Sequence, residues 1–307
     1  IWNLSYPIFL GLLAQNIINV TDTAFLGRVG EVELGASAMG GLFYICVFTI
    51  AFGFSIGSQI LIARRNGEGR YKDVGPVMIQ GGTFLLGLAV LMFGLTHLLA
   101  PSVVRLLISS DSIFDATMEF LNWRIFGFFF AFINVMFRAL YIGITRTKVL
   151  TMNAVVMALV NVLLDYILIF GKLGFPALGV TDAAVATLFS RIIEAAVMVV
   201  YVRCIDKKLK LLFADLLKRG GELTRDFLRY GLPIMGAQVV WSVNMLGQTM
   251  ILGRYDAGVI AAVSIANMLH NMMYIAMNGL SSAVGIITGK TVGSGPVSYT
   301  HLRAHET

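Results

Sequence analysis

A long internal repeat constrains the fold of this chain more than any other feature. Residues 7–69 reappear without a gap as residues 233–295, and the offset is constant because 233 − 7 and 295 − 69 both give 226. Both copies are long apolar helical stretches, which indicates two halves of one membrane-embedded architecture. Many transporters form a substrate path between two such lobes, so we look for the function between the halves. The identical pairs are Pro7/Pro233, Ile8/Ile234, Thr23/Thr249, Leu26/Leu252, Gly27/Gly253, Arg28/Arg254, Ala36/Ala262, Gly53/Gly279, Ser55/Ser281, Ile60/Ile286, Gly67/Gly293 and Gly69/Gly295.

The composition is that of a polytopic membrane protein. Hydrophobic residues make up 57% of the chain and charged residues only 13%, whereas about 25% of the residues in soluble domains are charged. The net charge of +6 does not indicate nucleic-acid binding, because the basic residues are grouped in a few loops without interleaved aromatic residues. Cys46 and Cys204 are far apart in the sequence, which favours neither a disulfide nor a metal site.

Apolar windows of about 20 residues, the length that crosses a bilayer, predict an all-α chain with eight transmembrane helices. No cleavable signal peptide is expected, because a helix begins almost at the first residue. No obligate protein partner is evident; the bilayer itself is the expected surrounding. The predicted helices are residues 5–27, 36–62, 76–98, 119–143, 149–170, 181–203, 230–252 and 258–289.

The distribution of basic residues predicts the orientation. Alternate loops are rich in Lys and Arg, and by the positive-inside rule these loops and the N-terminus are cytoplasmic. The basic, amphipathic segment 204–228 is expected to be a cytoplasmic linker between a six-helix first lobe, residues 1–203, and the first two helices of a second lobe, residues 229–291. The basic loop residues are Arg64, Arg65, Arg70, Lys72, Arg146, Lys148, Arg203, Lys207, Lys208, Lys210, Lys218, Arg219, Arg225 and Arg229.

The segment 292–307 contains the end of the repeat and then a sequence without the apolar pattern. Residues 296–307 resemble translated cloning sequence, and we exclude them from the fold. His301 and His305 are spaced as in a zinc-binding helix, but no Glu follows His301 and no third ligand is evident, so no metal site is expected there.

Several motifs, taken in order, resemble the multidrug and toxic compound extrusion (MATE) family. The resemblance covers nearly all of residues 1–295 and implies twelve helices in two pseudo-symmetric lobes, of which this chain would hold the first eight. It also implies a secondary active exporter that expels organic cations or amphipathic compounds in exchange for protons or sodium, in a bacterial cell membrane, without another cofactor. The motifs are Pro7 with Asp22-Thr23, Gly27-Arg-Val-Gly30, Leu34-Gly-Ala36, Ala63-Arg-Arg-Asn-Gly67, Gly143-Ile-Thr-Arg-Thr-Lys148, Asn161-x-x-x-Asp165, Gly179-Val-Thr-Asp-Ala-Ala184 and Ala186-Thr-x-x-Ser190.

Two acidic residues inside apolar helices are the main candidates for a functional site. A charge near the membrane centre costs at least about 2.5–3.5 kcal/mol, so it is rarely kept without a partner or a task. Asp22 and Asp165 each lie about six residues from the outer end of a predicted helix, hence at about the same depth of 9 Å. Equal depth permits them to meet.

Further polar side chains lie on the same helix faces as these acids. Gln15 and Asn19 share a face with Asp22, and Asn161 shares one with Asp165, which predicts a polar chamber inside the first lobe. Such a group of oxygens could relay a proton or hold sodium. The family resemblance assigns cation coupling to Asp22, Asn161 and Asp165 and, more weakly, to Asn134 and Thr187. The alternative is that these groups only hydrogen-bond helices to one another.

Other polar or aromatic residues have weaker interpretations. Arg191 and Glu194, three residues apart, are expected to form an internal ion pair, and a relay or gating role stays open. Arg138 is expected to be a snorkelling anchor near a helix end. Gln248 aligns with Asp22 in the repeat and, with Trp241, is a candidate for the wall of a substrate cavity.

Two other functions are weighed. An intramembrane hydrolase would use Ser55, which lies in a Gly-x-Ser-x-Gly pattern, but that motif requires an exposed turn. Small-residue spacing of Gly53 and Gly57, with Gly279 and Ala283 at the repeated positions, instead favours close helix packing. A lipid-linked oligosaccharide flippase would need several cavity bases for pyrophosphate, and the sequence suggests only Arg191 in the middle of the membrane.

Overall fold

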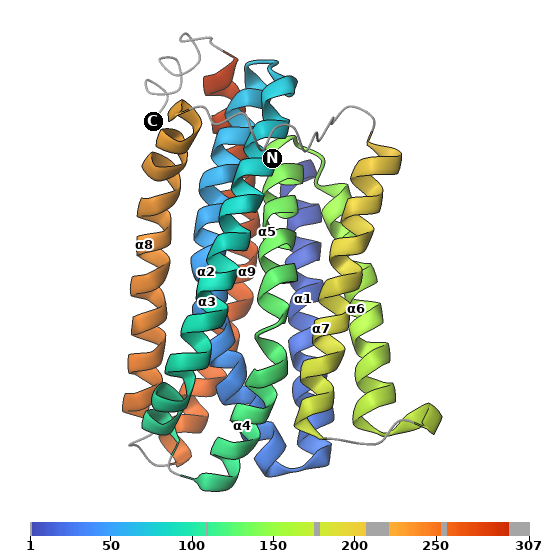
Figure 1. Cartoon of the computed structure of the whole chain (residues 1–307), viewed down its shortest axis with the longest axis vertical. Coiled ribbons are helices and arrows are strands. Elements are labelled where there is room, and N and C mark those ends of the chain that lie inside the picture. Colours follow the sequence, from blue (N-terminus) through green and yellow to red (C-terminus); the bar gives the residue numbers. More distant parts are fainter. Residues whose placement is uncertain (1, 109, 175–178, 207–220, 253–256, 295–307) are drawn as a thin grey trace.

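The computed structural model describes residues 2–108, 110–174, 179–206, 221–252 and 257–294, and over these residues the protein is entirely helical (Figure 1). The long helices run roughly parallel to one another and form one elongated bundle. The helices are α1 (Trp2–Val29), α2 (Glu31–Gly67), α3 (Val74–Leu107), α4 (Asp111–Arg124), α5 (Gly127–Gly143), α6 (Lys148–Ile169), α7 (Val180–Val200), α8 (Gly221–Leu252) and α9 (Ala257–Gly293), with short turns η1 (Tyr71–Asp73), η2 (Lys172–Gly174) and η3 (Tyr201–Ile205).

Most of these helices have the length and hydropathy of membrane spans. Among the residues that the structure describes, five helical segments pass this test, and α4 with α5 passes it as a bent pair, which gives up to six spans. α8 and α9, with 32 and 37 residues, run alongside them in the bundle (Figure 1). A helix of 20 residues already reaches across the hydrocarbon core. The chain is therefore a multi-pass membrane protein.

The prediction of one continuous helix at 119–143 is wrong, because the segment is broken into two helices and the first of them begins earlier, at Asp111. The two helices are α4 and α5, which meet at an angle of 54°. Gly127, the first residue of α5, weakens the helix at the break, because glycine is a poor helix former. Gly127 also lies against Tyr44, whose hydroxyl would be 3.6 Å from an added Cβ. Leu121 and Ile125, on either side of the end of α4, are buried.

The helix predicted at 230–252 begins earlier than expected. α8 begins at Gly221, nine residues before the predicted start at 230. Phe227, inside this first part of α8, is buried against the ring of Phe54, with the ring centroids 5.3 Å apart. Residues 207–220, with most of the predicted basic cluster, lie outside the described residues. The contact of Phe227 with α2 thus explains why α8 includes residues that the sequence assigned to the amphipathic linker.

The two copies of the repeat pack against each other reciprocally. α2 packs on α8, and the equivalent helix of the second copy, α9, packs on α1 and also meets α2. A Cβ added to Gly67 would collide with the backbone of Lys290, and a Cβ added to Gly293 would collide with the backbone of Arg64. Because Lys290 is the repeat partner of Arg64 and Gly293 that of Gly67, this contact has the geometry of a twofold axis. The absence of side chains at both glycines permits the close approach.

α5 is the centre of the core. Its buried side chains include Phe128, Phe132 and Tyr141, each with 0% of its surface exposed. α5 packs between α2, α3 and α7. Figure 1 shows α5 running through the middle of the bundle. Since α5 is apolar on nearly every face, its few polar residues, Asn134 and Arg138, are placed inside the protein.

A charge cluster closes the turn after α2. Glu68 accepts hydrogen bonds from Arg64 and Arg65, both at 3.1 Å, and Arg70 lies 3.4 Å away. Burial acts to raise the pKa of the Glu68 carboxyl, but the hydrogen bonds from Arg65 and Arg64 and the charges of both groups lower that pKa below its usual value. Arg65 also reaches Asp226 of α8 at 4.0 Å. Glu68 therefore keeps its negative charge, and Arg65 links this turn to α8.

Candidate functional site

The structure brings Asp22, Asn161 and Asp165 together between α1 and α6. With the amide of Asn161 oriented so that its nitrogen faces both carboxylates, Nδ2 lies 3.2 Å from Asp165 Oδ2 and 3.2 Å from Asp22 Oδ1. The two carboxyl groups also contact each other directly. Asn161 and Asp165 are completely buried, and Asp22 is half-buried at the edge of a cavity. We name these three residues the acid site.

The local sequence explains why these side chains meet. Asn161 and Asp165 are four residues apart, so they project from the same face of α6, the face that packs on α1. Toward the other end of the pair, Thr151 Oγ1 donates to the carbonyl oxygen of Pro7 at 2.8 Å. This bond holds α1 along α6 and sets their register, so that Asp22 lies at the height of Asp165.

Arg124, at the end of α4, is a neighbour of the acid site that the sequence reasoning missed. Its guanidinium lies 4.7 Å from the ring centroid of Tyr44 and 5.6 Å from that of Phe120, and its Nε is buried without a partner among the described residues. Arg124 and Asp22 line the same cavity. Its position within the helix predicted at 119–143 was a usable signal, but the direction of its side chain depends on the bend between α4 and α5.

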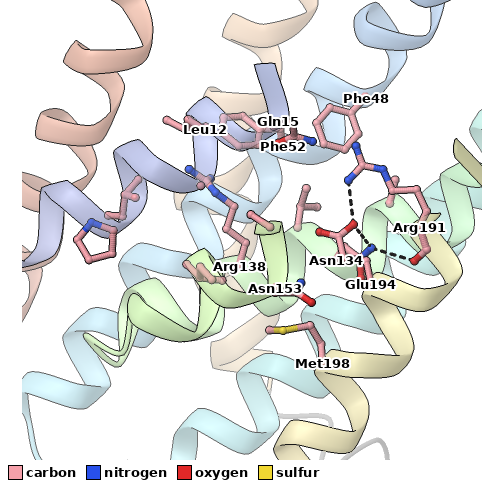
Figure 2. Close-up of a pocket in the computed structure, with 17 residues that line it drawn as sticks. Leu12, Gln15, Phe48, Phe52, Asn134, Arg138, Asn153, Arg191, Glu194 and Met198 are labelled. Carbon is pink, nitrogen blue, oxygen red and sulfur yellow. Dashed lines mark hydrogen bonds and ion pairs between the residues drawn. The ribbon is translucent and has the colours of Figure 1, made fainter. Parts of the chain in front are cut away.

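A second polar cluster joins α5 and α7. Arg191 and Glu194 form the ion pair that their spacing predicts, with Nη1 and Oε2 2.9 Å apart. Asn134 Nδ2 donates to Glu194 Oε2 at 2.7 Å and to the carbonyl oxygen of Arg191 at 3.3 Å. Both charged side chains are nearly buried, at 11% and 13% exposure. Figure 2 shows this cluster at the side of a cavity.

Two cavities separate the candidate residues into two groups. A cavity of about 350 Å³ is lined by Asn19, Asp22 and Arg124. A second cavity, of about 90 Å³, is lined by Gln15, the Asn134 cluster and Arg138 (Figure 2). Gln15 and Asn19 are thus on the same helix but face different cavities. The predicted polar chamber is divided rather than continuous.

Three other candidates lie apart from the acid site. Thr187 is buried, and its hydroxyl donates to the carbonyl oxygen of Ala183 in its own helix at 2.9 Å. Trp241 and Gln248 are exposed on α8 and line neither of the two cavities. Gln248 Nε2 instead donates to Asn244 Oδ1, one turn earlier, at 3.4 Å.

Two expectations about basic residues are wrong. Arg138 is not an anchor at a helix end, because its guanidinium lies over the ring of Phe52, 4.9 Å from the centroid, and the residue lines the smaller cavity. Arg191 is not the single base within the bundle, since Arg124 and Arg138 are also inside it. The guanidinium groups of Arg124 and Arg138 stack on aromatic rings of α2, Tyr44 and Phe52. Because these cation–π contacts stabilise the charges inside the bundle, the side chains do not have to extend to the membrane surface.

The geometry at Ser55 is that of a packing residue. Its side chain is 2% exposed, and Oγ donates to the carbonyl oxygen of Phe52 at 2.7 Å. The flanking glycines face α8: a Cβ on Gly57 would lie 2.7 Å from Gly231 Cα, and one on Gly53 would lie 3.1 Å from Met235 Cα. The Gly-x-Ser-x-Gly pattern is thus a close helix contact, and the hydrolase alternative is not supported.

Comparison with known proteins identifies the family. The sequence profile of the MatE family matches residues 7–167. Two relatives, each named "Probable multidrug resistance protein NorM", are 25% identical over 296 residues (Agrobacterium fabrum) and 26% identical over 301 residues (Mesorhizobium japonicum). Each alignment covers 95% of this chain, and the chain spans 63% of the length of either relative.

Solved structures have the same fold. A multidrug resistance MATE family transporter in an outward-facing conformation superimposes with a TM-score of 0.85 at 23% identity, over 95% of this chain and 64% of its own. A transporter of the MOP superfamily from Pyrococcus furiosus gives 0.84 at 23% identity, over 95% and 64%. Another MATE structure, in complex with the molecule MaD3S, also gives 0.84, at 22% identity over 95% and 65%. The sequence motifs, the helical bundle and the matching profile agree, and this chain belongs to the MATE family of transporters, which are not enzymes.

Proposed function

We propose that the protein is a secondary active exporter that expels organic cations or amphipathic compounds from a bacterial cell in exchange for protons or sodium. The observation that supports this most is the acid site. Two carboxyl groups and an amide meet in a buried position of the first lobe, where unpaired charge is costly. A proton or a hard cation bound there would remove the repulsion between the carboxylates. Loading and unloading of that ion would be coupled to substrate release.

Each residue of the acid site has a distinct proposed role. Asp22 faces the larger cavity and would receive the ion from solvent, whereas Asp165 is buried and would share it. Asn161 would hold both carboxylates by its amide nitrogen while a proton is bound. Sodium would require the amide to turn its oxygen toward the ion, since a cation is bound by oxygen atoms. Asn134 and Thr187, proposed on the family resemblance, would have supporting roles.

The structure adds one feature that a flippase would need, basic residues in cavities, but it does not place several unpaired bases together. Three arginines line cavities, namely Arg124, Arg138 and Arg191. The sequence suggested only one basic residue inside the membrane. A pyrophosphate needs several unpaired bases in one place, but Arg191 is paired with Glu194, and Arg124 shares its cavity with Asp22. The two buried carboxyl groups favour exchange of a cation. The cytoplasmic N-terminus remains part of the proposal on the positive-inside rule.

Transport by the full-length protein in proteoliposomes tests this function. Ethidium efflux would be followed after a proton gradient or a sodium gradient is imposed separately, with ATP alone as the control. We expect efflux with one of the two gradients and none with ATP, because the energy would come from ion exchange. Export without any ion gradient, or export driven by ATP, would contradict the proposal.

A further inference from the structure

An apolar groove lies on the outside of the bundle, where α8 of the second repeat meets α2 and α3 of the first. Phe54 and Phe227 form its floor and are buried, whereas Phe84, Leu228 and Leu232 on its sides are exposed. Figure 1 shows α8 at the edge of the bundle, beside α2 and α3. The groove therefore opens toward the surroundings of the protein and is separate from the two cavities described above.

The groove has the chemistry of a hydrocarbon site. The ring of Phe54 stacks on that of Phe84, with centroids 4.3 Å apart, and on that of Phe227, with centroids 5.3 Å apart. Phe84 is ten residues from the start of α3, which places it about 15 Å along the helix and within the bilayer. The volume of about 130 Å³ is below the roughly 300–1,000 Å³ of pockets for drug-sized ligands. A narrow apolar groove at this depth fits part of one acyl chain.

The internal repeat indicates that further helices of the second lobe would leave this groove open. In the first copy, α1 contacts α6 through Pro7, whose carbonyl oxygen accepts from Thr151, and through Gly11, where an added Cβ would lie 3.9 Å from Ala154. The repeat partners of Pro7 and Gly11 are Pro233 and Ala237, both exposed on α8. At about 100° per residue, they lie on the face of α8 opposite to the groove residues. A second-lobe counterpart of α6 would pack on that opposite face.

The end of the groove is basic. Arg225, Leu228 and Leu232 are spaced i, i+3, i+7, so Arg225 continues the groove face by one turn toward the end of α8. Within the described part of the chain, no carboxylate lies within 4.0 Å of Arg225, and the neighbouring Asp226 is matched by Arg65 at 4.0 Å. The positive-inside rule assigns this end to the cytoplasm, where the leaflet contains anionic lipids.

We propose that the groove binds one anionic phospholipid of the cytoplasmic leaflet, with an acyl chain along Phe54, Phe84 and Phe227 and the phosphate group at Arg225. An apolar groove that ends at an uncompensated cation is complementary to a lipid with a negative headgroup. The chain's own segment 207–220 is a poorer occupant, because it contains five basic residues and one acidic residue, and like charges repel beside Arg225. The lipid would bridge the two repeats, and the inference is separate from the proposed export function.

Native mass spectrometry of the delipidated full-length protein in detergent tests the inference. Dioleoyl phosphatidylglycerol and dioleoyl phosphatidylcholine are titrated separately, since they differ in headgroup charge and have the same acyl chains. We expect the wild type to bind phosphatidylglycerol about fivefold more tightly or better, the effect of one basic residue near the membrane surface. Arg225→Gln should remove this preference and leave the affinity for phosphatidylcholine unchanged. Leu232→Trp, which fills the groove, should lower the affinity for both lipids about fivefold or more.

Two variants outside the groove are the matched controls. Arg28→Gln replaces an exposed arginine at the other end of the bundle, and Leu98→Trp enlarges an exposed leucine of α3 far from Phe84. Neither should change the binding of either lipid. Equal binding of the two lipids by the wild type, or an unchanged preference in Arg225→Gln, would overturn the inference. Unchanged affinities in Leu232→Trp, or equal losses in the controls, would overturn it as well, because the lipid would then bind elsewhere.

Discussion

Replacement of Asp22 or Asp165 by asparagine is expected to abolish gradient-driven export by the full-length protein while expression and substrate affinity stay near wild type. Asparagine has a similar size and keeps hydrogen bonds, but it cannot bind the exchanged proton and it weakens a cation site. Since about 1.4 kcal/mol of lost coupling free energy is already tenfold, we expect a fall in export rate of about tenfold or more. The measurement is efflux rate against the imposed gradient.

Asp115→Asn is the matched control for this pair. Asp115 is exposed near the start of α4 and lies outside both cavities, so its replacement should leave export unchanged. If both acid-site variants export as fast as the wild type, the coupling site lies elsewhere, and Glu194 with Arg191 would be examined next. A fall in all three variants would indicate a general effect of charge rather than coupling.

Gly57→Leu is expected to destabilise the packing of the two repeats strongly. A Cβ at Gly57 alone would lie 2.7 Å from Gly231 Cα and 2.9 Å from Gly231 N, which are backbone atoms of α8 and cannot rotate away. α2 and α8 would have to separate, and overpacking of this kind costs about 1–3 kcal/mol or more. Thermal denaturation of the full-length protein in detergent should show a midpoint lower by several degrees.

Gly94→Leu provides the comparison at a position without such a contact. Nothing lies within 4 Å of an added Cβ at Gly94, which is within α3. The same change should therefore leave the denaturation midpoint close to the wild type. A midpoint that falls equally for the two variants, or stays constant for Gly57→Leu, would show that the α2–α8 contact is not close in the folded protein.

The main helices could be predicted because their signal is local. A run of apolar residues long enough to cross the bilayer indicates a helix without reference to its neighbours. The break between α4 and α5 could not be predicted in the same way. It depends on Gly127 lying against Tyr44 and on Arg124 stacking over Tyr44, and these contacts exist only after α2 has packed. The early start of α8 likewise depends on the contact of Phe227 with Phe54.

The acid site could be predicted from the sequence, whereas the positions of the arginines inside the bundle could not. A carboxylate inside an apolar helix has a short side chain and must find its partner at its own depth. The equal depth of Asp22 and Asp165, with the polar residues on the same helix faces, therefore made their contact a reasonable prediction. Arg124 and Arg138 have long side chains that can reach either the membrane surface or an aromatic ring. Which of the two occurs is decided by tertiary packing, here by Tyr44 and Phe52.

Ion uptake by the purified full-length protein tests the central proposal most directly. Proton uptake would be measured with a pH indicator in weakly buffered detergent solution, and sodium binding by calorimetry, for the wild type and for the protein with both Asp22→Asn and Asp165→Asn. We expect the wild type to bind one proton or one sodium ion that the double variant does not bind, because both ligating carboxylates are gone. Equal uptake of protons and of sodium by the two proteins would contradict ion exchange at the acid site.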